Sequence, residues 1–266
     1  MNHYEREMVN ILKRGADLYG MIGAKAEFEA EGTRVDELLR LLDIVNKANV
    51  KIALKIGGCE AKRDLLEAKQ YGVNYIIAPM IESEYALKKY INVKNKVFNS
   101  VDNDNIQFLF NLETISSYKN LDQIIQIASS KEGCNGLVFG RVDFLGSMEL
   151  ERKDIDSEEI SIYGEKIAYA CKKNNLDFVI GGGISLNSLN FLKKLNNIKL
   201  DRFETRKIIF NNKPLDNNLF EDALKDAVQF ELYWLLNKKD HYEYIYKEDE
   251  KRILMLEERL KSVINA

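Results

Sequence analysis

Two carboxylates in the sequence follow apolar runs that have the length of buried strands. Glu113 ends the run IQFLFNLE, and Asp143 comes shortly after the run NGLVFG. An unpaired carboxylate is costly to desolvate, so Glu113 needs a positive partner. A divalent cation held by both acids is one solution, because Mg²⁺ and Mn²⁺ prefer oxygen ligands. A salt bridge from Glu113 to Arg141 or Lys55 fits the spacing equally well.

A lysine ends another apolar run, VKIALKIG, in front of a glycine turn. Lys55 stands directly before the turn that contains Gly57 and Gly58. Its ammonium could contact a substrate carboxylate or keto oxygen, or its amine could form a Schiff base if burial lowered its pKa. The alternative is a rim lysine that pairs with Glu27 or Glu29. We expect Lys55, Gly57 and Gly58 to contact the substrate.

The stretch AEFEAEG supplies the candidates for a general base. Glu27, Glu29 and Glu31 alternate along it, so they share one strand face and at least one should point inward. The two histidines, His3 and His241, lie near the ends of the chain, so proton transfer at its centre must use other residue types. We expect Glu29 or a neighbouring acid to act as the base.

The run GGGIS ends a strand and opens a helix, which is a pattern that can bind anions. Backbone N–H groups at such a turn cradle phosphate or carboxylate, and glycine allows close approach. Gly182, Gly183 and Ser185 are therefore predicted to contact the substrate. A simple tight turn between strand and helix is the competing interpretation.

These residues need a scaffold that brings strand ends together, and the pattern of the chain predicts one. Short apolar runs alternate with amphipathic stretches of helical length, as in a parallel sheet built from strand-helix units. No linker rich in Pro, Ser or Gly interrupts the alternation, which indicates one domain. An open doubly wound sheet and a closed (β/α)₈ barrel both fit, and both place the active site at the carboxyl ends of the strands. The predicted strands span 20–29, 50–57, 73–80, 106–113, 135–140, 177–183 and 202–210.

The pattern changes after residue 215. We divide the chain into a barrel over 1–214 and a helical extension over 215–266, in which 217–239 and 240–266 are predicted as two long helices. The extension is rich in aromatic residues, which favours a subunit interface. Packing of these aromatics on their own barrel is an equal alternative.

Composition limits the partners. The 266 residues carry a formal net charge of −3, so no basic surface for nucleic acid or an anionic membrane is expected. Three cysteines without metal-binding spacing, no apolar leader and no long apolar run predict a cytoplasmic protein with reduced thiols.

Three segments, VNYIIAPMIES, FLFNLETISSYKNLDQI and CNGLVFGRVDFLGSM, together resemble the HpcH/HpaI aldolase and citrate lyase β-subunit family. The resemblance covers about residues 20–210. It implies a (β/α)₈ TIM barrel, a late helix commonly exchanged between subunits of a homo-oligomer, and a divalent metal on Glu113 and Asp143. The family arginine that binds the keto oxygen falls at Lys55, and its histidine base falls where AEFEAEG has none. The alignment suggests that the family's first strand is the one not seen here.

The activity implied by this resemblance is metal-dependent carbon–carbon lyase or aldolase chemistry on an α-keto acid, through the enolate of pyruvate. GGGIS suggests a substrate that carries a phosphate. Lys55 or Arg141 would add a second positive contact, and Glu29 would take the proton of the aldol hydroxyl. Two alternatives stay open: related enolpyruvate phosphoryl or acyl-CoA chemistry, and a non-catalytic barrel that serves as a binding subunit.

Overall fold

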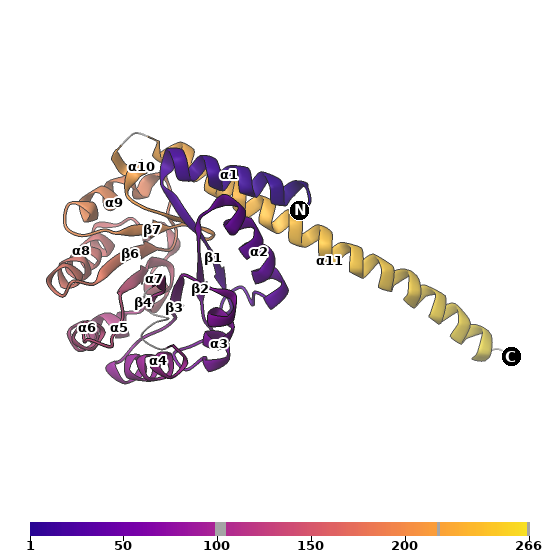
Figure 1. Cartoon of the computed structure of the whole chain (residues 1–266), viewed down its shortest axis with the longest axis horizontal. Coiled ribbons are helices and arrows are strands. Elements are labelled where there is room, and N and C mark those ends of the chain that lie inside the picture. The colour runs from indigo at the N-terminus through magenta and orange to yellow at the C-terminus, as the bar shows by residue number, and fades with distance from the viewer. Residues whose placement is uncertain (99–104, 217–218, 265–266) are drawn as a thin grey trace.

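The computed structural model describes residues 1–98, 105–216 and 219–264, and it forms a closed barrel of eight strands in chain order (Figure 1). The predicted TIM-barrel class is confirmed, and the open sheet is excluded. The strands are β1 (Met21–Glu27), β2 (Lys51–Lys55), β3 (Tyr75–Ala78), β4 (Gln107–Leu112), β5 (Gly136–Gly140), β6 (Asp177–Gly181), β7 (Arg202–Glu204) and β8 (Ile208–Phe210).

The last two strands differ from the prediction. Strands β1 to β7 pair in parallel, but β8 runs antiparallel to both β7 and β1. The run 202–210, predicted as one strand, is therefore a hairpin, closed where Thr205 N–H donates to the Ile208 carbonyl at 2.9 Å. The eighth strand arises from this division, and the absence of the family's first strand stays a prediction. Helix α1 (His3–Tyr19) precedes β1.

The inside of the barrel holds a single apolar layer. Alternate residues of a strand point to opposite faces, so one residue in two points inward. The inward set forms an apolar cluster separate from the larger core under the helices: Ala53, Tyr75, Ile77, Leu109, Val138, Val179 and Ile209. Beyond this layer, toward the carboxyl ends of β1 and β2, the inward positions are charged, and the side chains of Lys25 and Lys55 are buried there. The fold therefore gathers charge at the end where the site was predicted.

Helices cover the outside of the barrel (Figure 1). Their local signals are ordinary: Ser157 caps α8 by accepting from Ile160 N–H, and Gly72 ends α3 with a φ of 71°. The covering helices are α2 (Val35–Ala48), α3 (Lys62–Tyr71), α4 (Glu84–Val97), α5 (Ile115–Lys119), α6 (Leu121–Ala128), α7 (Arg141–Ser147), α8 (Glu158–Lys173), α9 (Leu189–Asn196) and α10 (Lys213–Asp216), with 3₁₀ turns η2 (Arg152–Asp154) and η3 (Leu186–Ser188).

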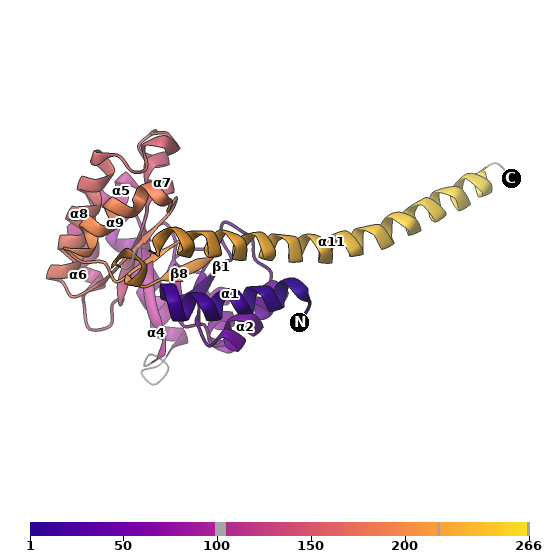
Figure 2. The same cartoon turned by 90° about the horizontal axis from the view of Figure 1, so that it is seen from above.

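The C-terminal extension contains one long helix instead of the two predicted. Helix α11 (Phe220–Ile264) runs for 45 residues without a break, because no glycine or proline interrupts it. Residues 217–218 and 265–266 of the predicted helices lie outside the described residues. The first half of α11 lies beside α1, and the second half of α11 extends well past the barrel (Figures 1 and 2). Across the described chain, the structure contains no helix with the length and hydropathy needed to cross a membrane.

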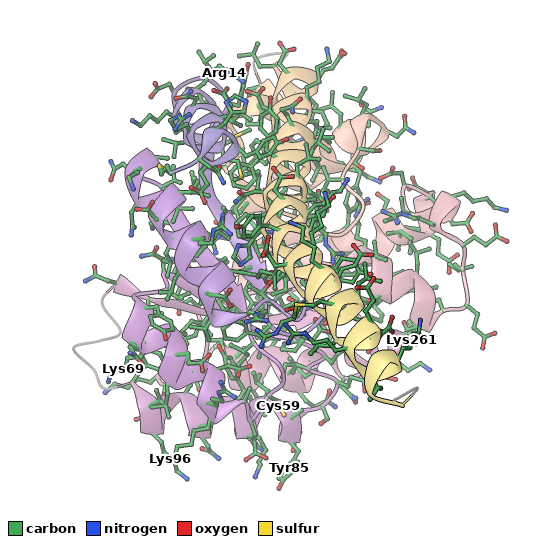
Figure 3. All side chains as sticks on the ribbon, turned by 90° about the vertical axis from the view of Figure 1, so that its right-hand side faces the viewer. Arg14, Cys59, Lys69, Tyr85, Lys96 and Lys261 are labelled. Carbon is green, nitrogen blue, oxygen red and sulfur yellow. The ribbon has the colours of Figure 1, made fainter. Side chains whose placement is uncertain are left out.

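The first half of α11 packs on its own barrel. Phe220, Phe230 and Trp234 are buried, so these three aromatics pack on their own barrel, which was one of the two alternatives predicted for the extension. Arg14 of α1 also forms a two-contact ion pair with Asp226 of α11, at 2.9 and 2.6 Å (Figure 3, in which Arg14 is labelled). Helix α11 is thereby held across the end of the barrel that carries the charges.

Candidate active site

A large pocket opens at the carboxyl ends of the strands. Its volume is about 940 Å³, and it is lined by the ends of β1, β2, β4, β5 and β6, by the β7–β8 hairpin and by one face of α11. Trp234 and Leu235 contribute the α11 wall. The volume lies at the upper end of the range usual for ligand pockets, roughly 300–1,000 Å³. The pocket has room for a molecule much larger than pyruvate.

Glu113 lies at the centre of the predicted site and is almost fully buried, with 1% of its surface exposed. Its Oε1 accepts from Met80 N–H at 2.9 Å, and its Oε2 accepts from the Asn111 side-chain amide at 2.6 Å. Lys55 Nζ lies 3.5 Å from Oε2. A side chain at Gly140 would place its Cβ 2.8 Å from Oε2, so glycine there leaves Glu113 its space. Of the two salt-bridge partners considered, the structure provides Lys55.

Asp143 lies in the first turn of α7 and lines the same pocket. Burial raises the pKa of Glu113, and the charge of Asp143 raises it further, against the opposing effects of Lys55, Met80 N–H and Asn111. The two acids are thus close enough to repel each other. In the part of the chain that the structure describes, no cluster of three or more His, Cys, Asp or Glu side chains is placed to hold a metal. A cation here would have two carboxylates from the protein.

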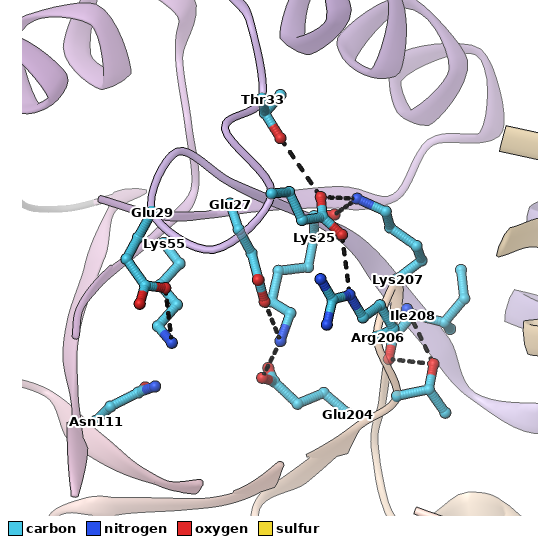
Figure 4. Close-up of polar contacts among 12 residues, drawn as sticks. Lys25, Glu27, Glu29, Thr33, Lys55, Asn111, Glu204, Arg206, Lys207 and Ile208 are labelled. Atoms are coloured by element: carbon cyan, nitrogen blue, oxygen red, sulfur yellow. Dashed lines mark hydrogen bonds and ion pairs between the residues drawn. The ribbon is translucent and has the colours of Figure 1, made fainter. Parts of the chain in front are cut away.

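Lys55 is held between acids. Its Nζ lies 3.1 Å from Glu29 Oε2 and 3.5 Å from Glu113 Oε2 (Figure 4 shows the Glu29 contact). Burial lowers its pKa, but the carboxylates of Glu113, Glu29 and Glu27 outweigh burial and raise it. A raised pKa keeps the amine protonated. Lys55 is therefore suited to stabilise negative charge, and the Schiff-base alternative loses its physical basis at this residue.

A second buried cluster, which was not predicted as a cluster from the sequence, lies beside the first. Lys25 Nζ lies 2.6 Å from Glu204 Oε1 and 3.2 Å from Glu27 Oε1 (Figure 4). Burial opposes the charge of Lys25, but the two carboxylates prevail and raise its pKa. Burial likewise opposes the charge of Glu27, but Lys25 prevails and lowers its pKa. The one available signal was the alternation of Lys25 and Glu27, which places both on the inner face of β1.

The hairpin delivers a third group of charges to the pocket. Glu31 pairs with Arg206 at 3.1 Å and with Lys207. Burial lowers the pKa of Lys207, although Glu31 opposes this. Lys207 also lies 5.6 Å from the centre of the Trp234 ring. These residues lie at the mouth because Glu31 follows the carboxyl end of β1, and Arg206 and Lys207 follow the carboxyl end of β7.

The predicted substrate contact by Arg141 is not what the structure shows. Arg141 is 0% exposed and does not line the pocket. A guanidinium has five N–H donors. They donate to the carbonyls of Gly182 (3.2 Å), Ile155 (3.2 Å) and Gly183 (3.3 Å), to Asp156 Oδ1 (2.7 Å) and to Ser188 Oγ (3.2 Å). Arg141 therefore supports the glycine loop from behind, and Glu113 is not among the partners of its guanidinium in the described part of the chain.

The glycines of the two predicted turns have different positions. Gly57 and Gly58 are not among the residues that line the pocket, and Gly57 N–H donates to Asp64 Oδ2 of α3 at 2.7 Å. Their contact with the substrate stays a prediction. Gly182, Gly183 and Ser185 do line the pocket. Their role in binding stays a prediction.

The sequence and the fold were compared with known proteins. Residues 24–189 match the family described as HpcH/HpaI aldolase/citrate lyase, which is more than half of the chain. The chain belongs to this family. Membership supports an aldolase-type or lyase-type function. A search of the curated proteins gives no match.

Solved structures share the fold of this HpcH/HpaI family member at low sequence identity. An HpcH/HpaI aldolase from Desulfitobacterium hafniense DCB-2 has a TM-score of 0.60 and 12% identity, over 77% of this chain and 83% of that one. An HpcH/HpaI aldolase/citrate lyase family protein from Burkholderia cenocepacia J2315 has a TM-score of 0.59 and 12% identity, over 91% and 90%. A variant of the citrate synthase SbnG has a TM-score of 0.54 and 10% identity, over 88% and 90%. At these identities the likeness shows the fold alone.

Proposed function

We propose that this family member is a carbon–carbon lyase that acts on an α-keto acid and depends on Mg²⁺ or Mn²⁺. The observation that supports it most is Glu113: a nearly fully buried carboxylate at the end of β4, beside Asp143, with a raised pKa. In the part of the chain that the structure describes, Lys55 provides the ammonium that pairs with Glu113, and it is shared with Glu29. The acids therefore outnumber the cations at this point, which is the condition that a bound divalent cation relieves.

The residues present fit such a cation. Glu113 and Asp143 offer carboxylate oxygens, and Asn111 Oδ1 is buried in the pocket without a hydrogen-bond partner among the described residues. Oxygen donors of these types suit Mg²⁺, which usually takes one or two carboxylates and leaves its other positions to water and substrate. We therefore assign Glu113 and Asp143 as the carboxylates that would hold the ion.

Bond cleavage next to a keto group moves negative charge onto the keto oxygen, and a bound divalent cation would stabilise that charge as a Lewis acid. The protein adds a second positive group at the same place. Lys55 stays protonated because of its acidic neighbours, and its ammonium points into the pocket between Glu29 and Glu113. It takes the place of the family arginine as the contact to the keto oxygen.

The proton of the aldol hydroxyl needs an acceptor, and Glu29 is placed to take it. Glu29 follows β1, lines the pocket, and lies 3.1 Å from Lys55 Nζ. This contact orients the carboxylate toward the same region as the keto-oxygen contact. Glu29→Gln should abolish cleavage of an aldol while leaving metal affinity intact, and undiminished turnover in that variant would remove Glu29 from this role.

Calorimetric titration tests the metal site directly. Mg²⁺ or Mn²⁺ is added to metal-free protein with and without pyruvate, for the wild type, Glu113→Gln and Asp143→Asn. We expect binding that pyruvate strengthens and that each variant weakens by about tenfold to a hundredfold or more. Glu149→Gln is a matched control, because Glu149 is an exposed acid just after α7 that does not line the pocket. Absence of metal binding in the wild type, or equal affinity in Glu113→Gln, would contradict the proposal.

Two alternatives from the sequence remain as further outcomes. Enolpyruvate phosphoryl or acyl-CoA chemistry would use the same cation site. Screening substrates for turnover would distinguish these reactions from the proposed lyase reaction. A non-catalytic binding subunit would show neither metal binding nor turnover.

The second half of α11 suits contact with another copy of the chain, since Tyr244 and Tyr246 are 70% and 63% exposed. We therefore propose a homo-oligomer that uses this half of α11.

A further inference from the structure

One basic side chain that lines the pocket has no acidic partner among the described residues. Most basic side chains that line it pair with a carboxylate: Lys25 with Glu204, Lys55 with Glu29, Arg206 and Lys207 with Glu31, and Lys238 with Glu37. Arg152 also lines the pocket, from the 3₁₀ turn η2. Its guanidinium has no hydrogen bond or ion pair to another residue that the structure describes. An unpaired cation of this kind can accept an anionic ligand without first losing a partner.

The glycine loop at residues 182–185 lines the same pocket, and buried Arg141 sets its orientation. The carbonyls of Gly182 and Gly183 both point to the Arg141 guanidinium, at 3.2 and 3.3 Å. In a trans peptide the N–H points opposite to the carbonyl, and the described chain contains no cis peptide bond. The N–H groups of Gly183 and Ile184 therefore point away from Arg141 and toward the pocket that these residues line.

Backbone conformation makes this orientation specific to glycine. Gly182 and Gly183 have φ of 81° and 63°, in the left-handed region that other residues rarely adopt. A Cβ on Gly182 would also lie 2.8 Å from the Val142 nitrogen. The loop can thus present two N–H groups to a ligand at close range. Ser185 N–H is not one of them, because it donates to Ser188 Oγ at 3.2 Å.

We propose that the N–H groups of Gly183 and Ile184 and the guanidinium of Arg152 bind a phosphoryl group on the substrate, with Arg141 as the positioning residue. A forked guanidinium and two convergent N–H groups match the several oxygens of a phosphate. The large pocket leaves space for this group in addition to an α-keto acid. The inference rests on the proposed lyase function, since the phosphate would be carried by the substrate of that reaction.

The test uses inorganic phosphate as the probe and the full chain as the protein. Amide NMR spectra are recorded during titration, and we expect the largest shifts at Gly183 and Ile184. Arg152→Ala should weaken phosphate binding by about tenfold or more, because it removes charge-assisted hydrogen bonds. Acetate should bind more weakly than phosphate, and tighter binding of acetate would overturn the assignment to a phosphoryl group.

Lys153→Ala is the matched control. Lys153 is adjacent, carries the same charge, is 73% exposed and pairs with Glu151 at 2.7 Å. We expect it to leave phosphate affinity nearly unchanged. Equal loss in Arg152→Ala and Lys153→Ala, or phosphate shifts that avoid Gly183 and Ile184, would refute the site.

Arg141→Lys tests the positioning role, because one ammonium cannot hold all the acceptors of the guanidinium. It should weaken phosphate binding while metal and pyruvate affinity stays as in the wild type. Loss of both would mean general disruption and would refute a specific role for Arg141. The two proposals fail separately: phosphate binding without metal binding contradicts the lyase, and metal and pyruvate binding without phosphate binding contradicts only this inference.

Discussion

The buried cluster of Lys25, Glu27 and Glu204 makes a quantitative prediction for Lys25→Met. These residues are 8%, 5% and 4% exposed, and Lys25 is the closest cation to both acids. Methionine preserves the length of the side chain but leaves two carboxylates buried without it. Removing one partner of a buried ion pair costs about 3–5 kcal/mol. At roughly 2–4 °C per kcal/mol for a chain of this size, we expect the melting temperature to fall by about 6–20 °C.

Thermal and urea unfolding at pH 7 measure this loss, and Lys88→Met provides the control. Lys88 also pairs with a carboxylate, Glu84 at 3.2 Å, but its side chain is 51% exposed, so its loss should cost no more than about 0.5 kcal/mol. The double variant Lys25→Met with Glu204→Gln should recover part of the stability, because one of the two unpaired charges is gone. The reasoning would be refuted if Lys25→Met cost no more than Lys88→Met.

The pH dependence of the same variant follows from the pKa shifts. The raised pKa of Lys25 means that its contribution to stability is complete below the unfolded value, near 10.4, and is lost as pH rises through the folded pKa. The lowered pKa of Glu27 means that its contribution is present above the unfolded value, near 4.3, and is lost as pH falls through the folded pKa. The stability gap between wild type and Lys25→Met should therefore be widest between about pH 5 and pH 10 and should narrow below pH 4.

Three further predictions concern other parts of the molecule. The raised pKa of Glu113 means that its ionisation costs stability as pH rises through the unfolded and then the folded pKa. Metal-free Glu113→Gln should therefore have a higher melting temperature than the wild type at pH 7. Below about pH 4 the two melting temperatures should be equal. Trp234 is 3% exposed and covers the pocket, so Trp234→Ala should lower the unfolding free energy by about 3–5 kcal/mol in urea titrations, and a loss below 1 kcal/mol would mean that α11 is not docked. Ile253 and Leu256 are 53% and 49% exposed, so changing both to Ser should reduce the mass measured by light scattering toward the monomer without lowering the melting temperature. An unchanged mass would place the contact between copies elsewhere.

Much of the architecture could be predicted from the sequence, because it depends on local patterns. The alternation of apolar runs and amphipathic stretches predicts strand-helix units, and parallel strands bring their carboxyl ends to one edge. That is why Glu113 and Asp143 could be expected in one pocket, and both line it. Lys55 could be placed beside acids for the same reason, and it pairs with Glu29.

Tertiary structure decided what depends on direction and distance. The segment after β7 turns the chain back, so β8 is antiparallel, although the run 202–210 was predicted as one strand. The partner of Glu113 among several nearby cations is Lys55, while Arg141 faces the back of the glycine loop. Residue spacing tells which side chains end a strand, but the choice between neighbouring cations depends on where each chain segment turns. Only the closed barrel specifies those turns, because they follow from packing between residues far apart in sequence.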